Sequence, residues 1–126
     1  MATNLLALPR VDMTVEVFTN EDWTDALAFY DDDGNPLLLD GIAFALEARH
    51  AVEAATALIS LTNDPDDNPT GGRIVIVGNE FHIDVPIAKM ARVPRGEYVF
   101  DAIGRADGMQ RVILTGALTV IEGVTR

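Results

Sequence analysis

The stretch Glu80-Phe81-His82-Ile83-Asp84-Val85 alternates strictly between polar and apolar residues. Successive side chains of a β-strand point to opposite faces, so a strand that is buried on one face shows a period of two. Phe81, Ile83 and Val85 would then face an apolar interior, and the three polar residues would face solvent. The stretch therefore predicts a strand of a β-rich core.

A second run, from Val112 to Val120, shows the same period. Its predicted apolar face consists of Val112, Leu114, Gly116, Leu118 and Val120. A glycine inside a strand often marks a bulge or a close approach of another part of the chain. We expect one of these two features at Gly116.

Further segments rich in β-branched and aromatic residues are also predicted strands. They are Met13–Thr19, Asp25–Tyr30, Ile42–Arg49, Arg73–Val77 and Glu97–Gly104. Gly78-Asn79 and Asp107-Gly108 each separate two strands, and such dipeptides predict tight hairpins. About seven short strands joined by turns predict an all-β, antiparallel domain, either a sandwich or a small barrel.

Two segments do not follow the strand pattern. Glu47–Ile59 is rich in alanine and carries apolar residues at helical spacing, so both a helix and strand ends remain open there. Pro86–Ala91 is predicted to form one helical turn that starts at the proline. The loop from Asn63 to Gly72 is expected to be exposed because it consists largely of turn-forming residues.

Composition narrows the class of protein. The chain has 126 residues, of which 48% are hydrophobic, as expected for one domain over residues 1–126, in which residues 1–24 have an uncertain role. It has no cysteine, which excludes disulfides, zinc–thiolate sites and a cysteine nucleophile.

Charge and hydropathy argue against nucleic acid and membrane as partners. The net charge is −11 and the basic residues are scattered, the closest group being Lys89, Arg92 and Arg95. A nucleic-acid binder needs a basic stripe that displaces counterions from phosphates. No stretch approaches the roughly 20 apolar residues that cross a bilayer. Residues 1–10 also lack the basic start of a signal peptide.

The residue types that catalysis requires are sparse. The chain has two histidines, His50 and His82, and one serine, Ser60, none of them in a recognisable catalytic motif. A hydrolytic triad needs a nucleophile, a base and an orienting acid, and a metal site needs three or four convergent ligands. We therefore expect no enzyme activity, no cofactor and no dedicated metal site.

Two acidic loops are weak candidates for calcium, which prefers clustered oxygen ligands. Their ligands would be Asp31, Asp33 and Asn35 in one loop, and Asp64, Asp66 and Asn68 in the other. Each loop begins like an EF-hand, but has proline at the position of the required glycine and an aliphatic residue at the position of the bidentate glutamate. Asp and Asn that bond their own backbone in turns explain both loops equally well.

Among the aromatic residues, Trp23 is the candidate for a surface contact. It lies in the polar stretch Asn20-Glu21-Asp22-Trp23, whereas Phe81, Tyr98 and Phe100 fall on predicted apolar strand faces. A carbohydrate- or calcium-dependent binding module, built from Trp23 and the two acidic loops, is therefore the alternative to a purely structural role.

Four segments in order resemble a family of tail-associated proteins from bacteriophages and prophages, and in particular the N-terminal domain of phage baseplate upper proteins. They are Asp33-Gly34-Asn35-Pro36-Leu37 running on to Arg49, Gly72-Arg73-Ile74 running on to Val85, Arg95-Gly96-Glu97-Tyr98-Val99-Phe100-Asp101, and Asp107-Gly108 running on to Val124-Thr125-Arg126. Phe100 stands where the family pattern has tyrosine, and residues 1–24 match no part of it.

The resemblance implies an immunoglobulin-like or related β-sandwich without catalytic residues. It further implies a virion component, assembled in the cytoplasm of a bacterial host, that forms homo-oligomers and binds other tail or baseplate proteins. These are expectations for the structure and for experiment.

Overall fold

The computed structural model describes residues 3–68 and 71–125. Nearly all of its regular structure is extended. The elements in chain order are η1 (Leu5–Ala7), β1 (Val11–Phe18), β2 (Trp23–Ala28), β3 (Ala43–Arg49), β4 (Ile59–Thr62), β5 (Arg73–Val77), β6 (Glu80–Val85), α1 (Ile87–Met90), β7 (Gly96–Ala106) and β8 (Met109–Ile121). The prediction of a mostly β chain with one short helical turn is confirmed.

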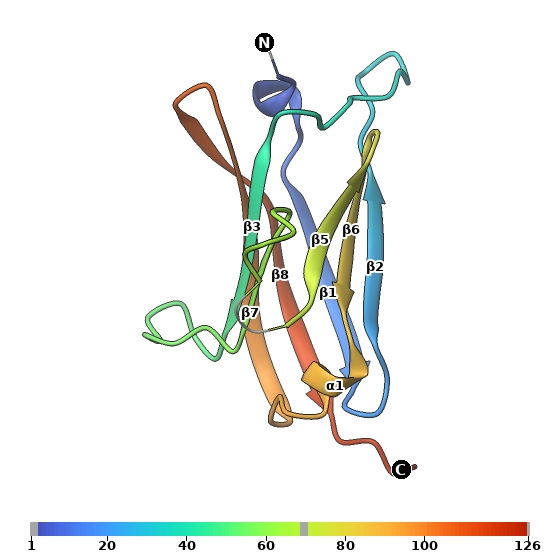
Figure 1. Ribbon diagram of the computed structural model, residues 1–126, viewed down its shortest axis with the longest axis vertical. Helices are drawn as coiled ribbons and strands as arrows, with labels where there is room; N and C mark the ends of the chain where they lie inside the picture. Colours follow the sequence, from blue (N-terminus) through green and yellow to red (C-terminus); the bar gives the residue numbers. More distant parts are fainter. Residues whose placement is uncertain (1–2, 69–70, 126) are drawn as a thin grey trace.

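The eight strands form two sheets, of five strands in the order β1-β8-β7-β3-β4 and of three strands in the order β2-β6-β5. Figure 1 shows the two sheets side by side, with the N-terminus at one end and the C-terminus at the other. The arrangement is sandwich-like. Because no strand of one sheet is hydrogen-bonded to the other in the part of the chain that the structure describes, the small-barrel alternative is not supported.

The expectation of an antiparallel domain of about seven strands needs correction. β1 pairs with β8 in parallel, from Val11 opposite Leu114 to Phe18 opposite Ile121, and Figure 1 shows both strands running the same way. Alternation of side chains reveals which face of a strand is buried but not the direction of its neighbour. The parallel direction of β1 relative to β8 therefore follows only from the pairing of these two strands, which are distant in the sequence.

Both predicted hairpins are present. Val77 pairs with Glu80 across Gly78-Asn79. Of these two turn residues only Gly78 has a positive φ (61°), which is the pattern of a type II′ turn. Ala106 pairs with Met109 across Asp107-Gly108, whose φ values of 53° and 76° are those of a type I′ turn. These turns match the right-handed twist of the strands that they join.

The two alternating stretches behave differently. In β6, Phe81, Ile83 and Val85 are buried, as predicted. In β8, Ala102 pairs with Leu114 while Ile103 pairs with Val112, so a bulge falls between these pairs. The extra residue, Ile113, and Leu114 are both buried. Val112 therefore does not share the face of Leu114, and the bulge lies there and not at Gly116.

Residues 47–59 contain no helix. β3 continues to Arg49, a loop follows, and β4 begins at Ile59, which pairs with Ala48. Val52, an apolar member of the predicted helical stripe, is 84% exposed, and Figure 1 shows this loop extending away from the sheet. β4 is the strand that the sequence pattern missed, because it has only four residues.

The interior between the sheets is apolar. Edge-to-face aromatic pairs join the layers, Phe44 with Phe81 at 5.2 Å and Trp23 with Phe100 at 5.7 Å between ring centroids. No polar or charged residue is buried within residues 3–68 and 71–125. None of the described helices is long and apolar enough to cross a membrane.

Candidate binding surface

The outer face of the five-stranded sheet carries a groove, which we call the sheet groove. Its residues come together through the strand register, in which Asp12 lies opposite Thr115, Thr115 opposite Asp101, and Asp101 opposite Glu47. The groove has a volume of about 540 Å³. It is lined by Asp12, Met13, Thr14, Glu47, Arg49, Val52, Val99, Phe100, Asp101, Thr115, Gly116 and Ala117.

The sheet groove combines apolar surface with carboxylates. Val99 and Ala117 are cross-strand partners on the outer face, and each exposes a small apolar side chain. Thr115 Oγ1 donates to Asp12 Oδ1 at 3.0 Å. Arg49 approaches Glu47 Oε1 at 2.5 Å and donates to the carbonyl of Ala54, so its charge is largely engaged locally. This surface suits contact with another protein.

A second hollow, which we call the edge groove, lies between β1 and β2, each of which is an edge strand of its sheet. Its volume is about 350 Å³. It is lined by Met13, Thr14, Val15, Glu16, Val17, Glu21, Asp22, Trp23, Thr24 and Asp25. Four of these residues are acidic and none is basic.

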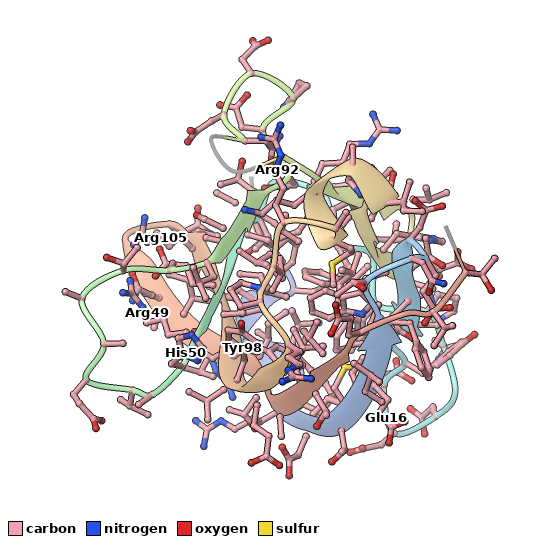
Figure 2. The ribbon with its side chains drawn as sticks, turned by 90° about the horizontal axis from the view of Figure 1, so that it is seen from below. Glu16, Arg49, His50, Arg92, Tyr98 and Arg105 are labelled. Atoms are coloured by element: carbon pink, nitrogen blue, oxygen red, sulfur yellow. The ribbon has the colours of Figure 1, made fainter. Side chains whose placement is uncertain are left out.

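A third hollow, of about 880 Å³, lies at the end of the molecule that carries α1. Arg92 and Arg95 line it, and Arg95 lies 3.7 Å from Glu122. Burial, together with the charge of Arg92, lowers the pKa of the neighbouring Lys89. Figure 2 shows Arg92 directed away from the interior, so this small basic group lies on the surface.

The histidines do not share a site. The ring of His50, after β3, stacks on Tyr98 at 4.5 Å between centroids, and Figure 2 shows the two rings together. His82, in the other sheet, contacts Glu80 Oε1 at 2.9 Å. Ser60 lies opposite Glu47 on β4. Over residues 3–68 and 71–125, no group of three or more His, Asp or Glu residues is arranged to hold a metal ion.

In the first acidic loop, the carboxylate of Asp31 organises the turn. Asp31 Oδ1 accepts the backbone N–H groups of Asp33 and Asn35, each at 2.9 Å. Backbone hydrogen bonds, that of Asn35 above all, lower the pKa of Asp31. This is the self-bonded turn that was the alternative to a calcium site.

The second acidic loop has the same character. Asp64 Oδ1 accepts the N–H of Asp66, and the Asn68 side chain bonds Thr62 and the carbonyl of Asp64. Pro69 lies outside the described residues. Calcium binding stays a prediction for both loops, and a thermal melt with and without millimolar calcium tests it, because a ligand of the native state raises the midpoint.

Trp23 is not a surface residue, and that prediction was wrong. Its side chain is 1% exposed, and its Nε1–H donates to Asp25 Oδ2 at 2.7 Å. The polar residues before it form the turn between β1 and β2, and Trp23 is the first residue of β2, facing the core. A carbohydrate site therefore cannot use Trp23 as its stacking platform.

Sequence reasoning missed two features, one in the core and one on the surface. The Tyr98 hydroxyl donates to the carbonyl of Pro94 at 2.5 Å, and burial raises the pKa of this phenol. The edge groove was also missed, because it exists only once β1 and β2 lie in different sheets. Gly-x-Tyr at the start of β7 is the local signal that could have indicated the tyrosine contact.

No family model matches this chain, and no curated protein is significantly similar to it in sequence.

Proposed function

We propose that this chain is a non-catalytic structural module of a phage tail or baseplate, of phage or prophage origin, that acts by binding other tail proteins. The observation that carries the proposal is the sheet groove, an open surface in which the exposed Val99 and Ala117 lie beside a row that contains Asp12, Asp101 and Glu47. Protein–protein interfaces combine exposed apolar side chains with polar ones in this way.

We also infer an immunoglobulin-like arrangement of the strands, which would support this role. In such domains one sheet holds the second, fifth and fourth strands, and the other holds the third, sixth and seventh. In this chain β2, β6 and β5 would be the second, fifth and fourth strands, and β3, β7 and β8 would be the third, sixth and seventh. β4 would then be the extra strand of variable-type domains, and β1 an added edge strand. Domains of this architecture commonly serve as recognition modules.

Two packing features point the same way. Tyr98, near the start of β7, bonds the backbone four residues upstream, as in the tyrosine corner of immunoglobulin-like domains. Phe100, two residues later, stands where antibody domains place the second cysteine of their inter-sheet disulfide. Here its contact with Trp23 of β2 joins the two sheets.

The phage-tail setting rests on the ordered resemblance of the sequence. Its segments include the turn at Asp33–Leu37, the start of β7 and the β7–β8 hairpin. Of the closing Val124-Thr125-Arg126, the arginine lies outside the described residues. Assembly in symmetric copies on neighbouring tail subunits, within the virion, is part of the proposal.

The test compares two matched substitutions, Val99→Glu in the sheet groove and Val77→Glu on the outer face of β5. Both valines are exposed strand residues. Light scattering measures self-association, and affinity capture measures recovery of tail proteins co-expressed from the same phage or prophage. Val99→Glu should abolish association and Val77→Glu should retain it. A wild-type chain that stays monomeric at all concentrations and captures no tail protein would overturn the proposal.

A further inference from the structure

We infer that the free edge of β1 docks an extended segment of a basic partner protein, which adds to the five-stranded sheet as a further strand. This inference rests on the proposed assembly function and gives it a recognition mode. In strand addition, main-chain hydrogen bonds between the two strands provide the affinity, and contacts of every second side chain of the added strand provide the specificity.

The backbone of β1 presents a regular set of groups at its open side. β1 pairs only with β8 among the described strands. The N–H of Thr19 bonds the carbonyl of Ile121 in β8, whereas the N–H of Phe18 bonds the Glu21 side chain and so points the other way. Successive residues of a strand alternate in the direction of their hydrogen-bonding groups. The N–H and C=O groups of Asp12, Thr14 and Glu16 therefore face the open edge.

The other sheet edges are less available. β4 has only four residues, and it contacts β5, so these two edges close the sandwich on their side. β2 carries an inward-leaning carboxylate, Asp25, a device by which natural edge strands avoid pairing. β1 has eight residues in continuous register and contains no proline, lysine or bulge. It therefore lacks these protections, and the charged side chains that it does carry, Asp12 and Glu16, are both acidic.

Glu21 defines one limit of the docking site. Its Oε1 accepts the N–H of Phe18 at 2.9 Å, and the chain turns at this point toward β2. A docked strand would therefore end before Phe18 and lie along the segment from Asp12 to Glu16. Phe18 is 41% exposed, which leaves an apolar contact at that end.

Charge selects the class of partner. The edge groove beside β1 carries Glu16, Glu21, Asp22 and Asp25, and the last three accept hydrogen bonds from neutral N–H donors. None of the four is ion-paired within the part of the chain that the structure describes. Figure 2 shows Glu16 on the outer side of β1, across the molecule from Arg49 and His50. A basic segment complements this edge.

A second copy of the chain is a poorer occupant. Each copy carries a net charge of −11. Antiparallel pairing of two β1 strands centred on Thr14 would also place Asp12 of one copy opposite Glu16 of the other. Like charges directly opposite each other destabilise a strand pair. The inferred occupant is therefore a lysine- or arginine-containing segment of a different protein.

The experiment uses the full chain and a synthetic eight-residue peptide of alternating lysine and valine. Hydrogen exchange followed by NMR reports the individual amides. Binding should slow exchange at Asp12, Thr14 and Glu16. A peptide with glutamate in place of lysine, and a lysine–valine peptide interrupted by a central proline, should not slow it, because the first is repelled and the second cannot remain a strand.

Proline substitutions locate the edge. Thr14→Pro removes an edge-facing N–H without removing a bond to β8, and should weaken binding of the lysine–valine peptide about tenfold or more. Ala26→Pro is the matched control. The N–H of Phe29 bonds Asn79, so by the same alternation the N–H of Ala26 faces the open edge of β2. The affinity of the Ala26→Pro chain for the lysine–valine peptide should equal that of the wild type.

If Thr14→Pro does not fold, amide hydrogen exchange in the wild-type chain still tests the inference, because it needs no substitution. No binding of the basic peptide, binding without protection of these amides, or unchanged affinity in a folded Thr14→Pro chain would overturn the inference. If the edge fails while Val99→Glu still abolishes capture of tail proteins, the assembly function stands and only strand addition is lost.

Discussion

The ring of Phe100 occupies the space in which a side chain at Gly116 would lie. The two residues are cross-strand partners in β7 and β8. A Cβ at position 116 would lie 2.3 Å from Phe100 Cζ and 2.6 Å from the carbonyl oxygen of Met13 in β1. Three neighbouring strands therefore depend on the absence of a side chain at this position, and this is the close approach that the glycine predicted.

Gly116→Ala should destabilise the fold by about 1–3 kcal/mol, because the added methyl group overpacks a site that is closed on both sides. The measurement is the midpoint of urea unfolding. Adding Phe100→Leu should recover part of the loss, since the smaller side chain vacates the space, and a double-mutant cycle gives the coupling. A Gly116→Ala chain as stable as the wild type would contradict the contact.

Tyr98→Phe should lower the free energy of unfolding by about 1 kcal/mol, because it removes the hydrogen bond to the carbonyl of Pro94. Tyr30→Phe is the matched control, since Tyr30 is 55% exposed and should change stability by less than about 0.5 kcal/mol. Both follow from urea unfolding monitored by circular dichroism. Equal effects of the two substitutions would show that the Tyr98 hydroxyl contributes nothing specific.

The fluorescence of Trp23 should report a buried indole. It is the only tryptophan in the chain and is 1% exposed, so its emission should be protected from iodide in the native state and shift to the red on unfolding. A Trp23→Phe, Tyr30→Trp chain, which places the indole on the surface, should be quenched readily. Equal quenching in the two folded chains would restore Trp23 as a surface residue.

Acid should weaken the turn at Asp31. Its pKa is lowered in the folded state by backbone hydrogen bonds, chiefly that of Asn35. A lowered folded pKa means that its stabilising contribution is present above the unfolded pKa and is lost as pH falls through the folded value. The midpoint difference between wild type and Asp31→Asn should therefore shrink from about pH 6 to about pH 2. A difference independent of pH would contradict this role.

Much of the fold could be predicted from local pattern. The predicted bounds of β1, β2, β3, β5, β6 and β7 agree with the structure to within two residues at each end. Both hairpin turns were also found, because Asp107-Gly108 and Gly78-Asn79 have the residue types that positive φ requires. The candidate surface was less predictable, since Asp12, Asp101 and Glu47 are distant in sequence and meet only through strand register.

The amino-acid sequence by itself determined where the main strands run, which faces of β6 are buried and where the chain turns back. These properties depend on residues within a few positions of one another. The tertiary structure alone decided that β1 pairs in parallel with β8, that a bulge buries Ile113 beside Leu114, and that Trp23 packs on Phe100. Each of these depends on which distant segments become neighbours, and side-chain alternation carries no information about that choice.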